Sequence, residues 1–169
     1  TVRNTWVGGN IGVPLTERLC NSEKQDVAVI ELSSFQLELF SPDYHAIDVE
    51  ERRSTASRVI SVQGWSPTIA GITNITPNHL DRHVSMDDYV RAKSNIVAFQ
   101  TAGDTAILNL DSALCRSLAD RTPARLLHFS LTQAVPEGAF LRGDVMVLRL
   151  DGQESALGTI GEVKLRGIH

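Results

Sequence analysis

The stretch GITNITPNHLDRH, residues 71–83, joins an apolar run to a polar cluster that contains two histidines, an aspartate and an arginine. The apolar part starts at Thr68 and is typical of a buried strand, because its isoleucines are bounded by turn residues. In an open parallel sheet, ligands bind beyond the carboxyl ends of the strands. The stretch therefore predicts a sheet and also the edge of that sheet at which chemistry takes place.

Other segments extend the same pattern along the chain. Further apolar runs that predict buried strands are residues 26–34, 105–111 and 125–131, and segments that predict helices are residues 14–23, 85–99 and 112–121. Ser85 is a suitable N-cap for the second of these helices. Alternation of strands and helices at this spacing predicts an α/β fold with a mostly parallel sheet and helices on both faces.

Two segments depart from this alternation. Residues 139–165 carry Arg-Gly-Asp and Asp-Gly turn signals between short β-rich runs, which predicts a small antiparallel β region at the edge of the sheet. Residues 41–66 show no clear period, and we interpret them as a long loop or insertion, or as a poorly signalled helix with a short extra strand.

Composition excludes several classes of protein. The 169 residues carry a net charge of −4 without a basic cluster, which argues against a nucleic-acid-binding protein. Cys20 and Cys115 lie far apart and form no CxxC motif, so a reducing cytosol is the simplest location. No apolar run approaches the roughly 20 residues that a membrane helix requires. Because the chain begins with Thr1 and stops at a Gly-containing turn, we expect residues 1–169 to be a single partial domain of a larger protein.

Glu31 lies at the end of an otherwise apolar strand, where an unpaired charge would cost several kcal/mol. A positive group should therefore meet its carboxylate. The alternatives are an arginine and a magnesium ion, held directly or through water.

His79 and His83 are four residues apart, a spacing that allows shared metal binding if the segment is helical. A lone histidine is more often structural, but His79 directly follows a strand. Arg82 is able to bind a phosphate or carboxylate, or to pair with Asp81. We expect a metal-side role for His79 and a supporting role for the other three residues.

Lys93 lies four residues after Tyr89 on the predicted helix 85–99, close to its buried face. Its side chain either extends to solvent or loses water around its amine. In the second case the pKa of the amine falls and the neutral form becomes available for covalent chemistry.

A Gly-rich turn, GGNIGVPL at residues 8–15, precedes the first predicted helix and suits close approach of the backbone to an anion. The GxxxxGK[ST] pattern of a nucleotide-binding P-loop is absent from the chain.

Taken in order, six motifs resemble the central domain of the Mur ligases. They are GGNIG, IELSSFQLE, TNITPNHLDRH, YVRAKSNI, ILNLD and the terminal LRGIH, residues 165–169, which is similar to the start of the junction to the family's C-terminal domain. ELSSFQLE resembles most closely the branch that adds D-glutamate. The resemblance implies a P-loop-NTPase-like fold and a bacterial, cytoplasmic, ATP-dependent amide ligase of peptidoglycan biosynthesis. Its expected substrates are UDP-N-acetylmuramoyl-L-alanine and D-glutamate, joined through an acyl phosphate.

The resemblance also implies roles for individual residues. Glu31 and His79 match the positions that hold two Mg²⁺ ions beside ATP, and Lys93 matches a lysine that the family carbamylates to help hold the second ion. Asn10 and Ser33 match positions near the muramoyl substrate or the phosphates. Nucleotide-side positions are matched by Asn109, Asp111 and His169.

The family's phosphate loop lies upstream of GGNIG, and neither it nor the N-terminal and C-terminal domains are among these residues. The segment 41–66 is also longer than the family pattern predicts. We therefore expect this chain alone to be inactive. The remaining alternatives are another Mur or folylpolyglutamate-type ligase, and a non-catalytic nucleotide-binding domain.

Overall fold

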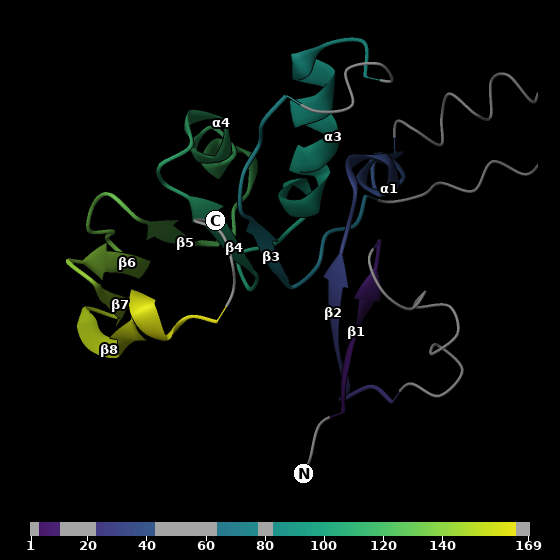
Figure 1. Cartoon of the computed structure of the whole chain (residues 1–169). Helices are drawn as coiled ribbons and strands as arrows, with labels where there is room; N and C mark the ends of the chain where they lie inside the picture. Colours follow the sequence, from purple (N-terminus) through teal and green to yellow (C-terminus); the bar gives the residue numbers. More distant parts are fainter. Residues whose placement is uncertain (1–3, 11–22, 43–63, 78–82, 165–169) are drawn as a thin grey trace, which may run out of the picture.

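The computed structural model of the chain describes residues 4–10, 23–42, 64–77 and 83–164. Their strands form two sheets (Figure 1). The smaller sheet pairs β1 (Thr5–Gly9) with β2 (Val27–Glu31) in parallel. The predicted helix 14–23 and most of the segment 41–66 lie outside the described residues.

The larger sheet has six strands, arranged in the order in which they occur in the sequence. They are β3 (Ile69–Ile72), β4 (Thr105–Asn109), β5 (Arg125–Ser130), β6 (Gly138–Arg142), β7 (Val145–Leu150) and β8 (Gln153–Thr159). Pairing is parallel from β3 to β6 and antiparallel from β6 to β8. The predicted parallel sheet with an antiparallel region at its edge is confirmed.

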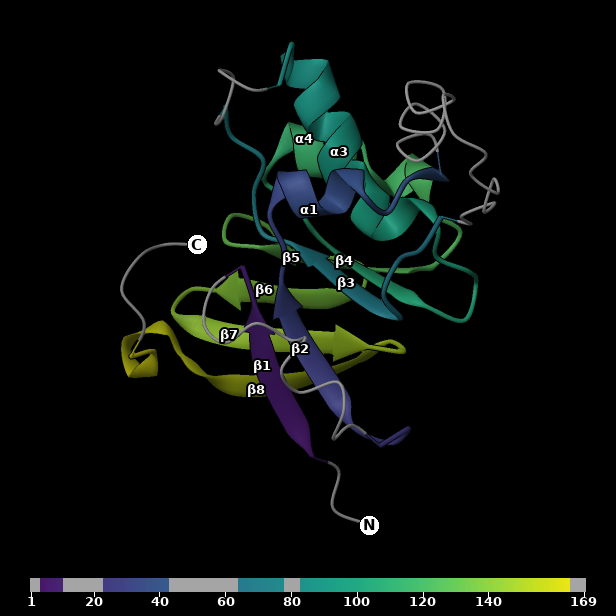
Figure 2. The same cartoon turned by 90° about the vertical axis from the view of Figure 1, so that its right-hand side faces the viewer.

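Helices cover one face of the larger sheet (Figure 2). Helices α3 (Met86–Ala98) and α4 (Ala113–Arg116) lie on this face, and the 3₁₀ turn η3 (Ala119–Arg121) follows α4. Helix α1 (Ser34–Glu38) packs against α3, and the 3₁₀ turn η4 (Ile160–Glu162) follows β8. Burial alternates along β3 and β4, as expected for strands with one covered face. The prediction of helices on both faces is therefore not met within the described residues.

The core lies between α3, α4 and this covered face. Leu108 of β4, Val97 of α3 and Leu118 are completely buried there. Burial of a side chain of this size stabilises the fold by about 1.5–3 kcal/mol. These contacts hold α3 against the sheet, and α3 carries Lys93.

Local signals explain the helix boundaries. The Ser85 side chain accepts a hydrogen bond from the Asp88 N–H, and two aspartates occupy the first turn of α3, so the predicted helix 85–99 is confirmed. The predicted helix 112–121 is instead divided into α4 and η3, and Ser112 is the N-cap of α4. Helix α1 was not predicted, although Ser33 and Gln36 form a capping box at its start.

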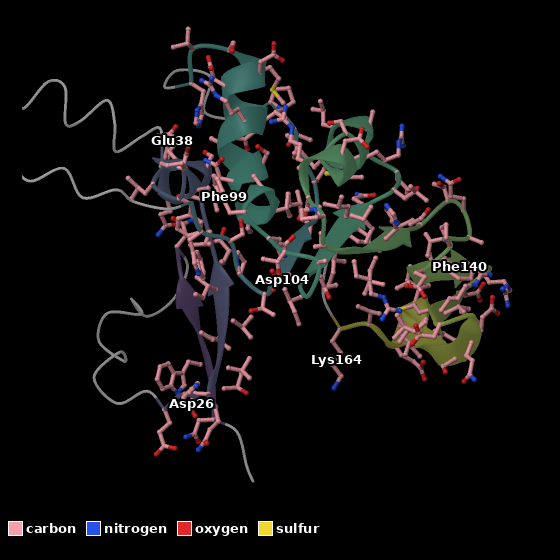
Figure 3. All side chains as sticks on the ribbon, turned by 180° about the vertical axis from the view of Figure 1, so that it is seen from behind. Asp26, Glu38, Phe99, Asp104, Phe140 and Lys164 are labelled. Carbon is pink, nitrogen blue, oxygen red and sulfur yellow. The ribbon has the colours of Figure 1, made fainter. Side chains whose placement is uncertain are left out.

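The antiparallel strands turn where the sequence indicates. Gly143, Asp151 and Gly152 have positive φ angles of 62°, 51° and 76°, which suit tight hairpin turns. Phe140 and Val147 form a second small core with Val135. Figure 3 shows Phe140 at the end of the molecule remote from Glu38 on α1.

The β1–β2 pair stands beside β3 without joining its sheet. The side chains of Val29 and Ile69 along these strands are 51% and 66% exposed. Helix α1 follows β2 and packs against α3, so the α1–α3 contact links the two sheets. No helix in the described ranges is long and apolar enough to cross a membrane.

Candidate active site

A pocket of about 520 Å³ lies between β2 and β3 at the carboxyl ends of both strands. Its polar side chains are Glu31 from β2, Thr73 and Asn74 after β3, and Lys93 from α3. The apolar lining comprises Val7, Val29, Ile30, Leu32, Leu37, Ile72 and Ile96. This is the edge of the fold at which the sequence predicts ligand binding.

The Gly-rich turn after β1 fixes the backbone of Glu31. Glu31 pairs with Gly9, and the Asn10 N–H donates to the Glu31 carbonyl at 2.8 Å. Gly9 has a φ of 119°, and a Cβ atom there would lie 2.2 Å from the Glu31 carbonyl oxygen. Only glycine permits this approach. Within the described residues no ion pair joins an arginine to the Glu31 carboxylate, which lines the pocket.

Lys93 approaches the same pocket from α3. Its Nζ atom lies 5.3 Å from the centroid of the Tyr89 ring, one helical turn earlier. Burial lowers the pKa of the Lys93 amine, and the negative charge of Glu31 partly opposes this shift, with a smaller contribution from Cys115. A lowered pKa agrees with the prediction that the Lys93 amine loses water around it.

Side-chain amides tie together the loops at the strand ends. Asn109 Nδ2 donates to the Thr73 carbonyl at 2.8 Å, and Asn109 Oδ1 accepts from the Asp111 N–H at 2.8 Å. Asn74 Oδ1 accepts from the Ile75 N–H at 2.9 Å. These bonds connect the end of β3 to the end of β4 beside the pocket.

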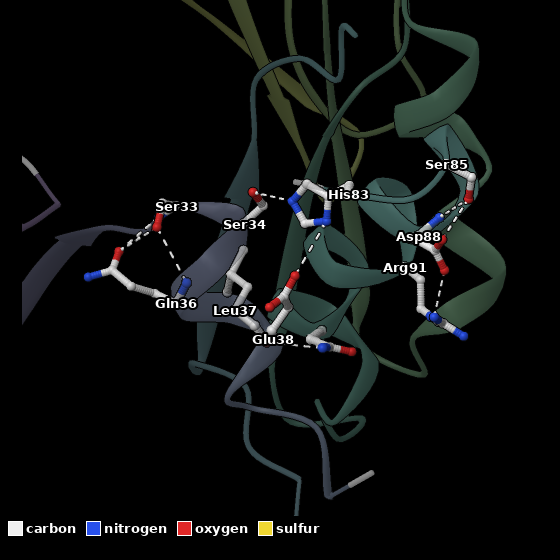
Figure 4. A network of polar contacts seen from close by, with 10 residues as sticks. Ser33, Ser34, Gln36, Leu37, Glu38, His83, Ser85, Asp88 and Arg91 are labelled. Atoms are coloured by element: carbon white, nitrogen blue, oxygen red, sulfur yellow. Dashed lines mark hydrogen bonds and ion pairs between the residues drawn. The ribbon is translucent and has the colours of Figure 1, made fainter. Parts of the chain in front are cut away.

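His83 connects α1 to the start of α3 (Figure 4). Its Nε2 lies 3.0 Å from Ser34 Oγ, and its Nδ1 lies 3.3 Å from Glu38 Oε1. The ring stacks on Phe35 with centroids 5.4 Å apart and contacts Tyr89 at 5.1 Å. His83 therefore links the start of α3 to a helix that begins 49 residues earlier.

Comparison with known families agrees with this geometry. The family description "Mur ligase middle domain" matches residues 41–165, which is most of the chain. The chain belongs to the Mur ligase family. Structures give the same fold: MurF from Acinetobacter baumannii aligns with a TM-score of 0.50 and 13% identity, and the alignment covers 92% of this chain and 38% of that one.

Among Mur ligases, sequence relatives point to one branch. A UDP-N-acetylmuramoylalanine–D-glutamate ligase from Lachnoclostridium phytofermentans is 35% identical over 167 residues, 99% of this chain. A ligase of the same name from Desulfitobacterium hafniense is 37% identical over 169 residues. The chain spans 32% of the length of each of these relatives.

Two of the residues that the Mur ligase resemblance marks for substrate contact have structural partners. The Asn10 backbone N–H donates a hydrogen bond to the carbonyl of Glu31, which lines the pocket. The Ser33 hydroxyl accepts from the Gln36 N–H at 3.3 Å and donates to Gln36 Oε1 at 3.1 Å, which caps α1. Asn10 is thus adjacent to Glu31, and the role of Ser33 as a cap was not predicted.

Asp111, marked for nucleotide contact, organises the loop after β5. Its carboxylate accepts from Ser130 Oγ at 2.6 Å, from the Leu131 N–H at 2.7 Å and from Thr132 Oγ1 at 2.7 Å. Burial acts to raise the pKa of Asp111, but these hydrogen bonds outweigh it, and the pKa lies below its ordinary value. Both carboxylate oxygens are therefore occupied by the protein.

His79 and His169 lie outside the described residues. The parts of the chain that the structure describes contain no group of three His, Cys, Asp or Glu side chains able to hold a metal. Mg²⁺ commonly takes one or two carboxylates and completes its shell with water and phosphate oxygens. A carboxylate such as Glu31 in an open pocket fits a magnesium ion that arrives with a phosphate group.

Sequence reasoning missed Ser34 and Glu38 as partners of His83. The capping box at Ser33 predicts a helix that would bring both side chains to one face, since they are four residues apart. No local signal relates that face to a histidine 49 residues later.

Proposed function

We propose that the full-length protein that contains this chain is an ATP-dependent ligase that joins D-glutamate to UDP-N-acetylmuramoyl-L-alanine. In this proposal, residues 1–169 are the central, ATP-binding part, and domains on both sides complete the enzyme. The observation that carries the proposal is the meeting of Glu31 and Lys93 in one pocket at the carboxyl ends of β2 and β3. The names of relatives at 35–37% identity supply the substrates.

The reaction has two steps, a phosphoryl transfer and the formation of an amide bond. A carboxylate oxygen of the acceptor attacks the γ-phosphorus of ATP, and ADP leaves. The neutral amine of D-glutamate then attacks the acyl carbon, forms the amide and loses a proton, while inorganic phosphate leaves with the former carboxylate oxygen. Such phosphoryl transfer is catalysed mainly by positioning and by charges that offset the developing negative charge.

Glu31 would supply a carboxylate for the first Mg²⁺ ion at the strand end, and His79 is proposed for the second. When bound, the two ions neutralise charge on the phosphate oxygens. The tight turn at Gly9 fixes the backbone from which the Glu31 side chain extends into the pocket.

Lys93 is proposed to act as a carbamate. The ammonium group first loses a proton, and the neutral amine then adds to CO₂, so that a nitrogen–carbon bond forms and a second proton is released. The two steps together turn a cation into an anion. The lowered pKa of the amine supports this step, since only the neutral form is a nucleophile. As a carbamate, Lys93 would help to hold the second ion.

Asn10 and Ser33 are proposed to lie near the acceptor or the phosphates, and Asn109, Asp111 and His169 near the nucleotide. We place the reaction in the bacterial cytoplasm, where ATP is available. The proposal involves neither nucleic acid nor insertion into a membrane.

The test is a screen with the purified full-length protein. Phosphate release is measured with ATP, Mg²⁺ and UDP-N-acetylmuramoyl-L-alanine, and each candidate amino acid is added in turn. We expect release only with D-glutamate, and its loss in Lys93→Ala. Turnover with another amino acid or a folate acceptor would assign the protein to another ligase, and absence of turnover with every pair would indicate a non-catalytic domain.

A further inference from the structure

His83 is buried between two helices, with only 4% of its surface exposed. On one side it contacts Ser34, Phe35 and Glu38 of α1, and on the other it contacts Tyr89 of α3. Because the Glu38 carboxylate only accepts, Nδ1 is the nitrogen that faces it with a proton. Both nitrogens of the ring therefore have a polar neighbour on α1.

The α1 side of this contact leads to Glu31. Helix α1 starts three residues after Glu31, and β2 is not paired with β3. The position of Glu31 relative to the larger sheet therefore depends on how α1 sits on α3. Among the described residues, His83 contacts Ser34 and Glu38, the first and last residues of α1, and Asn95 Nδ2 donates to the Leu37 carbonyl at 3.0 Å.

The α3 side of the contact leads to Lys93. The Tyr89 ring is tilted by 59° to the His83 ring, with 5.1 Å between centroids, and Lys93 Nζ lies over its face at 5.3 Å from the centroid. Tyr89 is itself 5% exposed, so it has little room to turn. A shift of His83 would be passed through this ring to the Lys93 amine.

We propose that His83 is a positioning residue, which fixes Glu31 through Ser34 and Glu38 and fixes Lys93 through Tyr89. The proposal rests on the proposed function, because it concerns the same pocket. An apolar side chain of similar size would fill the same space, and buried polar contacts often add little net stability over apolar packing. An imidazole additionally fixes the orientation of α1, because only one ring orientation lets Nε2 contact Ser34 while Nδ1 contacts Glu38.

The test uses the full-length protein and four variants. His83→Phe keeps a ring between Phe35 and Tyr89 but loses both polar contacts. Glu38→Leu removes one contact, whereas Glu38→Gln retains an acceptor for Nδ1. Gln100→Met is the matched control, because Gln100 is equally buried on the chain after α3, donates to the Pro67 and Thr105 carbonyls, and lies outside the pocket.

Two readouts are measured. The first is the ligase reaction, in which a misplaced catalytic group costs up to about 100-fold. We expect kcat to fall about 10- to 100-fold in His83→Phe and Glu38→Leu while the KM for D-glutamate changes less than about twofold. Glu38→Gln should retain kcat within about twofold, and Gln100→Met should lose thermal stability but keep kcat.

The second readout is independent of turnover. With ¹³Cε-labelled lysine, the Lys93 resonance is assigned by its absence in Lys93→Arg. It should move in His83→Phe and Glu38→Leu and stay in place in Glu38→Gln and Gln100→Met. Parent-like resonance and kcat in folded His83→Phe would overturn the proposal, as would an equal loss of kcat in Gln100→Met. If His83→Phe does not fold, the two Glu38 variants decide in the same way.

The two proposals fail separately. If the parent protein lacks D-glutamate ligase activity, the proposed function fails, and the Lys93 resonance still tests the positioning role. If the parent is active and the resonance is indifferent to His83 and Glu38, only the positioning role fails.

Discussion

At the scale of single residues, the pocket depends on two side chains with opposite charges in their ordinary forms. Glu31 ends a strand whose backbone is held by a glycine turn, and Lys93 is half-buried on a helix that packs into the core. Burial favours the neutral amine, while Glu31 favours the cation. Carbamylation would resolve this conflict in favour of an anion, which only a bound cation makes stable beside Glu31.

Replacement of Lys93 tests this directly. Lys93→Ala removes the amine, and we expect kcat to fall at least about 100-fold, as when one group that stabilises a transition state is lost. Lys93→Arg should be equally inactive, since a guanidinium stays protonated and does not add CO₂. Initial rates of phosphate release measure both variants. Activity within tenfold of the parent in either one would contradict a carbamate role.

The lowered pKa of Lys93 also sets a pH dependence. Only the neutral amine reacts with CO₂, so the carbamate fraction should rise with pH, starting at lower pH than for an ordinary lysine. A ¹³C NMR titration with ¹³C-bicarbonate measures the carbamate signal, with Lys93→Ala as the blank. A signal that first appears in the range of exposed lysines would show that burial does not activate this amine.

Gly9 is the residue whose backbone the pocket requires. Gly9→Ala places a Cβ atom against the Glu31 carbonyl and forces a φ of 119° on a residue with a side chain, so we expect the free energy of unfolding to fall by about 1–3 kcal/mol. Gly103→Ala is the control, because its nearest neighbour would be 3.7 Å from the new atom. Urea denaturation measures both. Equal stability of the two variants would refute the close approach.

At the scale of elements, two roles are distinguished for Ser33: it caps the N-terminus of α1, and it is proposed to contact the substrate. As an N-cap, Ser33 stabilises the helix, and Ser33→Ala should lower the free energy of unfolding by about 1 kcal/mol. Ser33→Asp keeps the cap and should retain that stability. As a substrate-side residue, Ser33 should raise the KM for the acceptor when changed to either residue. Denaturation curves and acceptor KM values for both variants separate these roles.

The antiparallel strands carry their own pH sensitivity. Hydrogen bonds from Arg142 and then Arg149 lower the pKa of Glu154 to about 2, against an ordinary value of 4.5. A lowered folded-state pKa means that the stabilisation is present above about pH 4.5 and is lost as pH falls toward about 2. Parent stability should therefore drop more steeply with acid than that of Glu154→Gln. Parallel curves between pH 6 and pH 3 would show that these contacts do not stabilise the fold.

Element by element, the sequence predicts regular structure where the signal is local. Continuous apolar runs predict β4 and β5, and the Asp151–Gly152 pair predicts the last hairpin, because these residues favour the positive φ angles of a tight turn. Helix α1 was missed because the predicted strand 26–34 extended to Ser34, the first residue of the helix, although Ser33 and Gln36 form a capping box.

What sequence does not predict is the pairing of distant elements. Glu31 and Lys93 were expected at one edge by the rule for parallel strands and by resemblance to the Mur ligases, and the pocket brings them together. The contact of His83 with Ser34, and the separation of β2 from β3, depend on packing between segments far apart in the chain. No period or motif encodes such contacts.

At the scale of the whole molecule, the chain spans 32% of the length of relatives that match nearly all of it. It contains no GxxxxGK[ST] sequence with which to cradle a triphosphate. We therefore expect the 169-residue chain alone to release no phosphate from ATP above a Lys93→Ala control. Release that depends on Lys93 would show that this part suffices for hydrolysis.

In the proposed reaction, the full-length protein activates its acceptor as an acyl phosphate in the pocket of Glu31 and Lys93. The most direct measurement is oxygen transfer from UDP-N-acetylmuramoyl-L-alanine labelled with ¹⁸O in its carboxylate. Mass spectrometry should find one ¹⁸O atom in each phosphate released with D-glutamate, and no labelled phosphate in Lys93→Ala. Unlabelled phosphate from the active parent would contradict the account.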